Sequence, residues 1–233
     1  MPLFGSRKNL PRPLCDEHGP CQALANISVF EVRDRLRLLI TKSRGLGPDP
    51  MARQIDDELS VVLCVDAGKR AGKTEALSIA EHAADQWSIS RAELWERAFA
   101  NLATEQLNRQ VFDASNGDTI HTVNGMGAWP GAAHALRLEN ALGGGIELPN
   151  GALVALPTNN ALCAVPIRTS LSLNAIRFLI DLSKELAAGD PAPLTPSLFW
   201  YRDGWIENLN VGSDGMMRVS PRFRDMTNTL PAG

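Results

Sequence analysis

The segment Gly72-Lys73-Thr74 contains the residue types that most directly suggest a chemistry in this chain. It follows an apolar run at residues 59–65 and a first glycine at Gly68, an order typical of a phosphate-binding loop, or P-loop. In such a loop the backbone N–H groups surround the phosphate, the lysine contacts its outer oxygens and the hydroxyl binds Mg²⁺. Gly68, Gly72, Lys73 and Thr74 are therefore candidate ligands for Mg-ATP or Mg-GTP.

Two departures weaken the P-loop interpretation. The pattern requires its first glycine at position 67, but the chain has Ala67, whose Cβ resists the positive φ that glycine accepts. A nucleotide-hydrolysing fold also needs a second buried strand that ends in an acidic residue, and the nearest match, Asp181, lies inside a helical pattern. We therefore favour a strand, a lysine-rich surface loop and a helix that runs to about Trp87. Nucleotide or phosphate binding is kept as an alternative.

Cys15, His18 and Cys21 form a C-x2-H-x2-C spacing that could bring three metal ligands together within one turn. Zinc accepts such a mixture of thiolates and imidazole, but a structural site needs a fourth ligand. No fourth ligand is evident nearby, although a distant histidine could supply it. A disulfide between the two cysteines is not expected in a reducing cytosol. We favour an irregular arm with unconnected cysteines and keep a zinc-tied N-terminal arm as a further alternative.

Conventional catalytic sets are not recognisable elsewhere in the sequence. The chain contains no G-x-S-x-G, H-E-x-x-H or C-x-x-C motif, and its four histidines are scattered. Glu81 and Asp85 flank His82 at a one-turn spacing, but such pairs are common on solvated helices. We therefore predict no catalytic residue and no required cofactor, and leave open whether the chain catalyses a reaction.

The composition is that of a globular protein. Apolar residues make up 44% and charged residues 21% of the 233 residues, which is enough to form the core of one large domain. The net charge of −3 argues against a dedicated nucleic-acid binder. The sequence shows no apolar signal segment and no run long enough to cross a bilayer, so we predict a soluble, cytoplasmic chain without membrane insertion.

Periodicity and capping residues predict an α+β fold with four or five helices and an antiparallel-rich mixed sheet. Two capping boxes, Ser28 with Glu31 and Ser90 with Glu93, begin helices, and the first of these is expected to end near Gly45. Further elements are expected as helices at residues 132–142 and 172–188, and as strands at residues 59–65, 146–148, 152–156, 162–165, 197–201 and 205–207.

Proline positions and apolar content divide the chain into three parts. Residues 1–25 contain four prolines and little periodicity, which predicts an irregular N-terminal arm. Residues 26–209 are expected to form a single α+β domain. Residues 210–233 contain few apolar side chains, so we predict a C-terminal tail that lies over the surface.

Three groups of motifs follow one another in an order found in one known family. They are Ser90-Arg-Ala-Glu-Leu with Ala98-Phe-Ala-Asn-Leu, then Leu153-Val-Ala-Leu-Pro, then Leu194-Thr-Pro-Ser-Leu-Phe with Asp203-Gly204. From Leu59 onward, over about two-thirds of the chain, this order resembles the YtpQ-like family of bacterial proteins. The cysteine-bearing arm and Asn159-Asn160 depart from the family pattern. The family has no established activity, so the resemblance implies a bacterial origin and a fold rather than a reaction.

The sequence lacks a recognisable reaction, and we therefore predict a non-catalytic binding or regulatory module that acts on another protein. Nucleic acid is not the expected partner. An exposed apolar or aromatic patch on the sheet would support this interpretation. The two alternatives are an enzyme that binds a nucleotide or phosphate through the P-loop-like turn, and a metal-tied N-terminal arm. The sequence does not indicate an oligomeric state.

Overall fold

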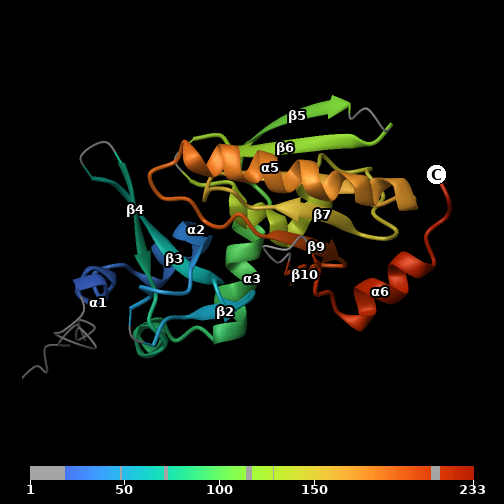
Figure 1. Cartoon of the computed structure of the whole chain (residues 1–233). Helices are drawn as coiled ribbons and strands as arrows, with labels where there is room; N and C mark the ends of the chain where they lie inside the picture. Colours follow the sequence, from blue (N-terminus) through green and yellow to red (C-terminus); the bar gives the residue numbers. More distant parts are fainter. Residues whose placement is uncertain (1–18, 48, 71–72, 114–116, 128, 211–215) are drawn as a thin grey trace, which may run out of the picture.

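Two antiparallel β-sheets and the helices on their faces make up the fold (Figure 1). The computed structural model describes residues 19–47, 49–70, 73–113, 117–127, 129–210 and 216–233. The predicted α+β class is confirmed, and within these residues every paired strand runs antiparallel to its neighbours. The strands form two sheets rather than one, and the same ranges contain six α-helices and three 3₁₀-helices.

The smaller sheet is built around its longest strand, β3. The four strands are β1 (Leu36–Lys42), β2 (Ala52–Gln54), β3 (Leu59–Arg70) and β4 (Lys73–Ser78). β1 pairs along one edge of β3, while β2 and β4 pair one after the other along the opposite edge. Residues 59–65 are buried on both faces of this sheet, one face in the main core and the other against Trp129. A buried strand of this kind is what the apolar run predicted.

The larger sheet has six strands in the order β10-β9-β7-β8-β6-β5. They are β5 (Leu107–Asp113), β6 (Thr119–Gly125), β7 (Ala152–Ala155), β8 (Ala161–Pro166), β9 (Leu198–Arg202) and β10 (Trp205–Asn208). β9 and β10 form the predicted hairpin, in which Asp203 and Gly204 adopt φ values of 51° and 77°, as a two-residue turn with left-handed residues requires. The strand predicted at residues 146–148 is wrong, because these residues are unpaired.

Two helices begin directly after the predicted caps, Ser28 and Ser90. In chain order the helices are α1 (Gly19–Leu24), α2 (Val29–Arg35), η1 (Glu81–Trp87), α3 (Arg91–Leu102), η2 (Ala132–Arg137), α4 (Leu138–Ala141), η3 (Ser170–Asn174), α5 (Ala175–Ala188) and α6 (Pro221–Asn228). Ser90 accepts a hydrogen bond from the Glu93 N–H at 3.1 Å, which fixes the start of α3. The predicted helix over residues 172–188 is confirmed as η3 followed by α5.

The helix expected from Ser28 to near Gly45 is only partly present. Ser28 caps it as predicted, but it ends at Arg35, and residues 36–42 form β1 instead. Leu36, Leu38 and Ile40 are fully buried, at the alternate positions that a strand directs to one face. The spacing of the apolar residues in this run fits both a helix and a strand, and pairing with β3 decides for the strand.

Residues 19–24 of the predicted arm and residues 221–228 of the predicted tail form helices that pack on the rest of the chain. Residues 1–18 of the predicted arm lie outside the described residues, but α1 begins at Gly19, and Cys21 and Leu24 are buried in the main core. Residues 210–233, for which we expected a surface tail, include α6, whose Phe223 and Met226 are buried. Helical spacing of these two residues gives a short segment enough apolar surface to dock on the sheet.

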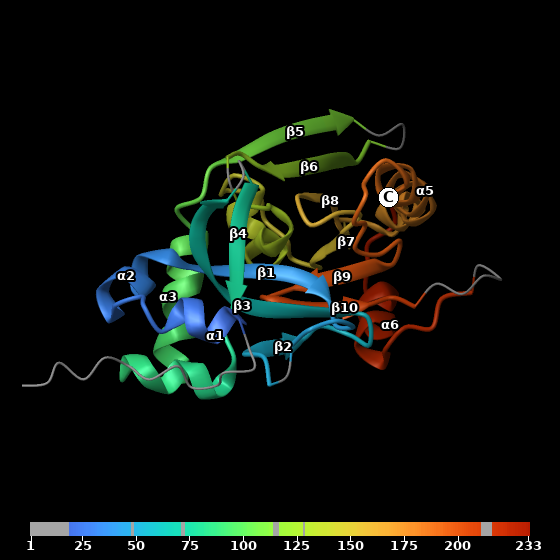
Figure 2. The same ribbon diagram turned by 90° about the vertical axis from the view of Figure 1, so that its left-hand side faces the viewer.

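The six-stranded sheet separates two layers of the molecule. One face packs against α5 and α6, and the other packs against η2, α3 and the smaller sheet. Figures 1 and 2 show α5 lying along one face of the sheet while β5 and β6 extend past it. Among the described residues, no helix is both long enough and apolar enough to traverse a bilayer.

Candidate functional site

The segment kept as an alternative phosphate-binding site lies where the antiparallel strands β3 and β4 meet in a β-hairpin. The helix expected after Thr74 is wrong, because β4 runs back along β3 and pairs Thr74 with Lys69. Gly68 has a φ of 88° and lies in a bulge, and its N–H donates to Oδ1 of Asp66 at 2.8 Å. Gly72 lies outside the described residues. A hairpin lacks the helix N-terminus that a P-loop places against phosphate, and one candidate N–H group already has a carboxylate partner.

The structure places one of the three predicted metal ligands beside a histidine. Cys21, 3% exposed, has its Sγ 3.4 Å from Nε2 of His82. Cys15 and His18 lie outside the described residues. Within the described ranges, no group of three or more His, Cys, Asp and Glu side chains is arranged to hold a metal ion. The sequence spacing alone did not identify His82 as the neighbour of Cys21.

The carboxylates that flank His82 in the sequence are engaged elsewhere. Nε of Arg91 lies 3.1 Å from Oε2 of Glu81, and its Nη1 lies 2.5 Å from Oδ1 of Asp85. Residues 81–87 form a 3₁₀-helix rather than the α-helix that the spacing argument assumed. These carboxylates therefore hold η1 to the start of α3 and do not form a site with His82.

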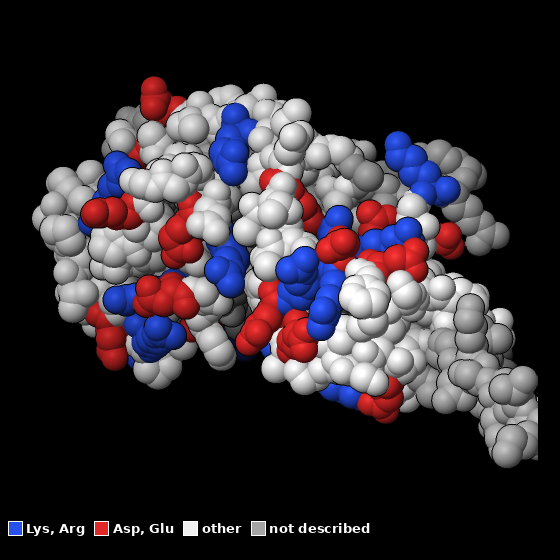
Figure 3. Space-filling view, turned by 180° about the vertical axis from the view of Figure 1, so that it is seen from behind, with Lys and Arg blue, Asp and Glu red and all other residues white. Residues whose placement is uncertain are grey.

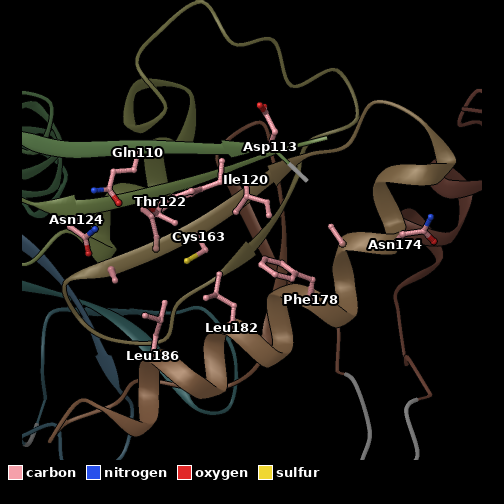
Figure 4. A pocket seen from close by; sticks show the side chains of 14 residues that line it. Gln110, Asp113, Ile120, Thr122, Asn124, Cys163, Asn174, Phe178, Leu182 and Leu186 are labelled. Carbon is pink, nitrogen blue, oxygen red and sulfur yellow. The ribbon is translucent and has the colours of Figure 1, made fainter. Parts of the chain in front are cut away.

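A groove of about 660 Å³ lies between α5 and the strands β5, β6 and β8 (Figure 4). It is the candidate functional site because its walls are apolar and large parts of them remain in contact with solvent. Phe112 on β5 and Phe178 on α5 are 51% and 50% exposed. The other apolar side chains at the groove include Ile120, Leu182 and Leu186.

The floor of the groove is one face of three neighbouring strands. Gln110 pairs with Thr122, and Thr122 pairs with Cys163, so these three side chains form a row across the sheet. Phe112 and Ile120 form the next pair on the same face. Strand register therefore gives the floor an apolar end and a polar middle.

The wall of the groove is a second apolar stripe on α5. Phe178, Leu182 and Leu186 follow one another at four-residue spacing, which places them on one side of the helix. Leu179 and Ser183, one position further on, are buried on the adjoining side, where α5 covers β7, β8 and β9. The helix thus has more apolar surface than the sheet beneath it covers, and Figure 4 shows the three side chains directed toward the strands.

The polar groups of the described lining are a thiol, a carboxylate, three amides and one hydroxyl. Burial raises the pKa of the Cys163 thiol to about 11, so this sulfur is a protonated thiol at neutral pH and a poor nucleophile. Asp113 supplies the carboxylate of the described lining, at the end of β5. The remaining polar groups are the amides and hydroxyl of Gln110, Asn124, Asn174 and Thr122.

Neither β5 and β6 nor the groove that they line was predicted from the sequence. A usable signal was present, since the dipeptide Asn116-Gly117 separates two runs rich in β-branched and aromatic residues. β5 has no alternation of apolar and polar residues in its sequence, because residues 108–113 are exposed on both faces of the sheet.

The molecular surface away from the groove is electrostatically mixed. On the face opposite that of Figure 1, basic and acidic side chains are interspersed (Figure 3). Several of them form ion pairs between α2 and α3, such as Arg33 with Glu93 at 2.7 Å and Asp34 with Arg97 at 3.2 Å. As far as the described residues show, this face offers no single-sign surface for a phosphate backbone to follow.

Comparison of the chain with models of known families, with curated proteins and with solved structures gave no match. The resemblance to the YtpQ-like family therefore stays a prediction. The groove and the chemistry of its lining are therefore the basis for a proposed function.

Proposed function

We propose that this chain is a non-catalytic binding module that holds an amphipathic helix of a partner protein in the groove between α5 and β5–β6. The half-exposed aromatic lining carries the proposal, because Phe112 and Phe178 present large apolar surfaces at one concave site. Exposed apolar surfaces of this kind mark interaction sites in soluble proteins.

The width of the uncovered sheet favours a helix as the occupant. Neighbouring strands lie about 5 Å apart, so β5 and β6 together present a strip roughly 10 Å wide. An α-helix with its side chains has a diameter of about 10–12 Å. A partner helix that lies beside α5 would therefore complete the helical layer over the sheet.

The exposure of the walls favours a protein over a small ligand. Small-molecule sites enclose most of the ligand surface. Here the two phenylalanines remain half in solvent, so a compact ligand at the floor would leave their outer parts wet. Covering the exposed half of each ring removes roughly 100 Å² of apolar surface, or about 2.5 kcal/mol per ring. The two rings together give about 5 kcal/mol, which only reaches the lower end of the cost of association, so a stable complex also needs contacts with the other apolar side chains of the groove.

The polar groups of the floor define the chemistry of the occupant. Gln110, Thr122 and Asn124 offer hydrogen-bond donors and acceptors at the centre of the groove. A helix that is apolar on two sides and carries a small or polar residue between them would satisfy these groups. A continuous leucine stripe would leave them buried without partners, at a cost of about 1–3 kcal/mol each.

We place this function in the cytoplasm. Cys64 and Cys163 are buried and form no disulfide with each other. Reduced thiols are the usual state in a reducing compartment, which supports this part of the proposal.

Site-directed photocrosslinking tests the proposal. A benzophenone amino acid replaces Phe112 or Phe178 in the full chain, and adducts formed in cells are mapped by mass spectrometry. Both positions are expected to capture one segment of one partner protein, at residues spaced by three or four. Val111 provides the matched control, because it is 57% exposed on the same strand but points to the opposite face.

The captured segment is then tested as a synthetic peptide. Binding is expected to induce helix in the peptide and to weaken at least tenfold in Phe178→Ser, while Val111→Ser binds as the wild type does. The proposal fails if adducts from positions 112 and 111 coincide, if the peptide binds in an extended form, or if the captured chain is a second copy of this protein.

A further inference from the structure

We propose that the outer edge of β5 pairs with the same edge of a second copy of this chain, so that the two six-stranded sheets join into one. β5 is the last strand in the order β10-β9-β7-β8-β6-β5, and no described strand pairs with its outer side. Figures 1 and 2 both show β5 at the margin of the described fold. This edge lies in the plane of the sheet, whereas the groove lies on one face of it.

The backbone groups that point outward from β5 follow from its pairing with β6. The N–H of Met126 donates to the carbonyl of Gln106 at 2.9 Å, and these two residues continue the register of the strand pair. Opposite residues of antiparallel strands alternate between hydrogen-bonded and non-hydrogen-bonded pairs, so every second residue from Gln106 onward bonds to β6. The backbone groups that point away from the sheet belong to Leu107, Arg109, Val111 and Asp113.

β5 lacks the features with which edge strands usually prevent pairing with another chain. Such strands are short, bulged, or carry proline or lysine. The seven residues of β5 include neither proline nor lysine, and their register against β6 runs without a shift. Strands commonly have about five or six residues, so β5 is not shortened. Its outer side therefore offers a regular row of backbone donors and acceptors to a further strand.

Charge selects one register for the pairing of two copies. In a two-fold symmetric antiparallel pair, the outward-pointing residues of one copy meet those of the other. An axis at Val111 places Arg109 of each copy opposite Asp113 of the other. An axis at Arg109 would oppose two like charges, and an axis at Gln110 would place both charges opposite apolar residues. Opposite charges stabilise a cross-strand pair and like charges destabilise it, which favours the axis at Val111.

The side chains of the charged pair are available for this contact. Nε of Arg109 donates to the carbonyl of Ala141 at 2.6 Å, and its Nη2 donates to the carbonyl of Asn140 at 3.3 Å. A guanidinium has further N–H donors, so Nη1 can serve the carboxylate of the second copy. Figure 4 shows the side chain of Asp113 directed away from α5. By symmetry the dimer contains two such charge pairs.

The paired edges join through the backbone at the axis and on both sides of it. Val111 meets its counterpart at the axis, and its side chain is 57% exposed in the single chain. Each hydrogen-bonded pair exchanges two bonds, so the three pairs of this register give about six backbone hydrogen bonds. Few side chains are covered, and a small interface of this kind is expected to form a reversible dimer that depends on concentration.

Oligomeric state is the primary test. Sedimentation velocity of the full chain is expected to show a reversible monomer–dimer equilibrium. Val111→Pro is expected to weaken the dimer at least tenfold, because it removes the N–H at the axis, which points away from β6 and is not needed there. Val111→Thr keeps the N–H and the β-branched shape, and this matched control is expected to dimerise as the wild type does. Melting temperatures verify that both variants are folded.

Charge reversal tests the register. Asp113→Arg and Arg109→Asp are each expected to be monomeric, because each places like charges opposite one another at both ends of the paired segment. An equimolar mixture of the two variants is expected to form a heterodimer, since both contacts then join opposite charges. Recovery in the mixture also shows that each variant is folded. In the wild type, amide exchange at Arg109, Val111 and Asp113 is expected to slow as concentration rises.

Three outcomes overturn the proposal. They are a wild type that stays monomeric up to about 1 mM, a dimer that Val111→Pro leaves intact, and two folded charge variants that do not associate when mixed. The groove is judged separately. Capture of a second copy at position 112 that disappears in Val111→Pro arises from the edge, whereas capture of a second copy at position 178, on α5, counts against the groove.

Discussion

The two ends of the six-stranded sheet differ in how their outer face is covered. At the β9–β10 end, Trp200 is fully buried and meets Phe223 of α6 edge to face, with ring centroids 5.2 Å apart. Its Nε1 donates to the carbonyl of Asn150 at 2.9 Å. At the β5–β6 end, Phe112 and Phe178 remain half exposed beside the groove. The first end is completed by the chain's own C-terminal helix, whereas the second has aromatic side chains and no described helix over them.

Because of this difference, we expect the aromatic residues at the two ends of the sheet to have different roles, one set in folding and the other in binding. Aromatic residues at the covered end release their surface from water when the chain folds, and so contribute to the free energy of folding. Those at the open end keep about half of that surface in water, and under the proposed function they would release it when a partner covers it. The comparison therefore predicts large stability effects at one end, and binding effects with little loss of stability at the other.

The largest expected effect comes from Gly151→Ala at the covered end. An added Cβ would lie 2.0 Å from the carbonyl oxygen of Tyr201, and Gly151 has a φ of 78°. Overpacking and left-handed strain together are expected to cost roughly 3–5 kcal/mol of unfolding free energy, measured by urea denaturation. Gly204→Ala is the control, because it has a φ of 77° and open space around it, and is expected to cost about 1–2 kcal/mol. Equal costs for the two variants would contradict the close packing of β7 against β9.

The next effect is the loss of the α6 anchor. Phe223→Ala removes an aromatic ring that is 3% exposed and packed on Trp200, so it is expected to cost about 3 kcal/mol and to quench or shift tryptophan fluorescence. Chemical denaturation followed by circular dichroism provides the measurement. A cost below about 1 kcal/mol would mean that α6 does not complete this end of the sheet.

The matched change at the open end is Phe112→Ala. The side chain is already half in solvent on an edge strand, so the variant is expected to lose less than about 1 kcal/mol of stability. Its affinity for the partner helix identified by crosslinking is expected to fall at least tenfold, by isothermal titration calorimetry. A loss of stability as large as that of Phe223→Ala would erase the distinction between the two ends.

The smallest effect is a pH dependence at β6. Burial, with a further contribution from the charge of Arg168, lowers the pKa of His121 below its ordinary value of 6.5. Because the unfolded chain then binds a proton more readily, the contribution of His121 to stability is complete above pH 6.5 and is lost as the pH falls through its pKa in the folded state. His121→Asn is expected to flatten the dependence of the unfolding free energy on pH below 6.5. If the unfolding free energy of the variant depended on pH as that of the wild type does, the titration of His121 would not be the cause of this dependence.

Elements with strong local signals were predictable from the sequence. Ser90 and Glu93 define the start of α3, and Asp203-Gly204 define the turn between β9 and β10, because capping and left-handed turns depend on neighbouring residues. The fate of residues 73–78 was not predictable in this way. Their composition suits a helix, but hydrogen bonds to β3 hold them as β4, since tertiary pairing outweighs intrinsic propensities of less than about 1 kcal/mol per residue.

The candidate groove was predictable only as a general expectation. An exposed aromatic patch on the sheet was the feature expected of a protein-binding module, but Phe112 and Phe178 were not assigned to it. They are 66 positions apart in the sequence and belong to a strand without apolar alternation and to a helix with two apolar sides. Their meeting depends on the strand order β8-β6-β5, which no local pattern encodes.

The sequence by itself determined the α+β class, the capped helices, the tight turns and the C-x2-H-x2-C spacing of the arm, because each depends on residues within a few positions of one another. The tertiary structure decided which end of the large sheet stays open, paired β4 with β3 where a helix was expected and brought His82 to Cys21. These outcomes depend on contacts between distant segments, whose free energies exceed the local preferences that a sequence displays.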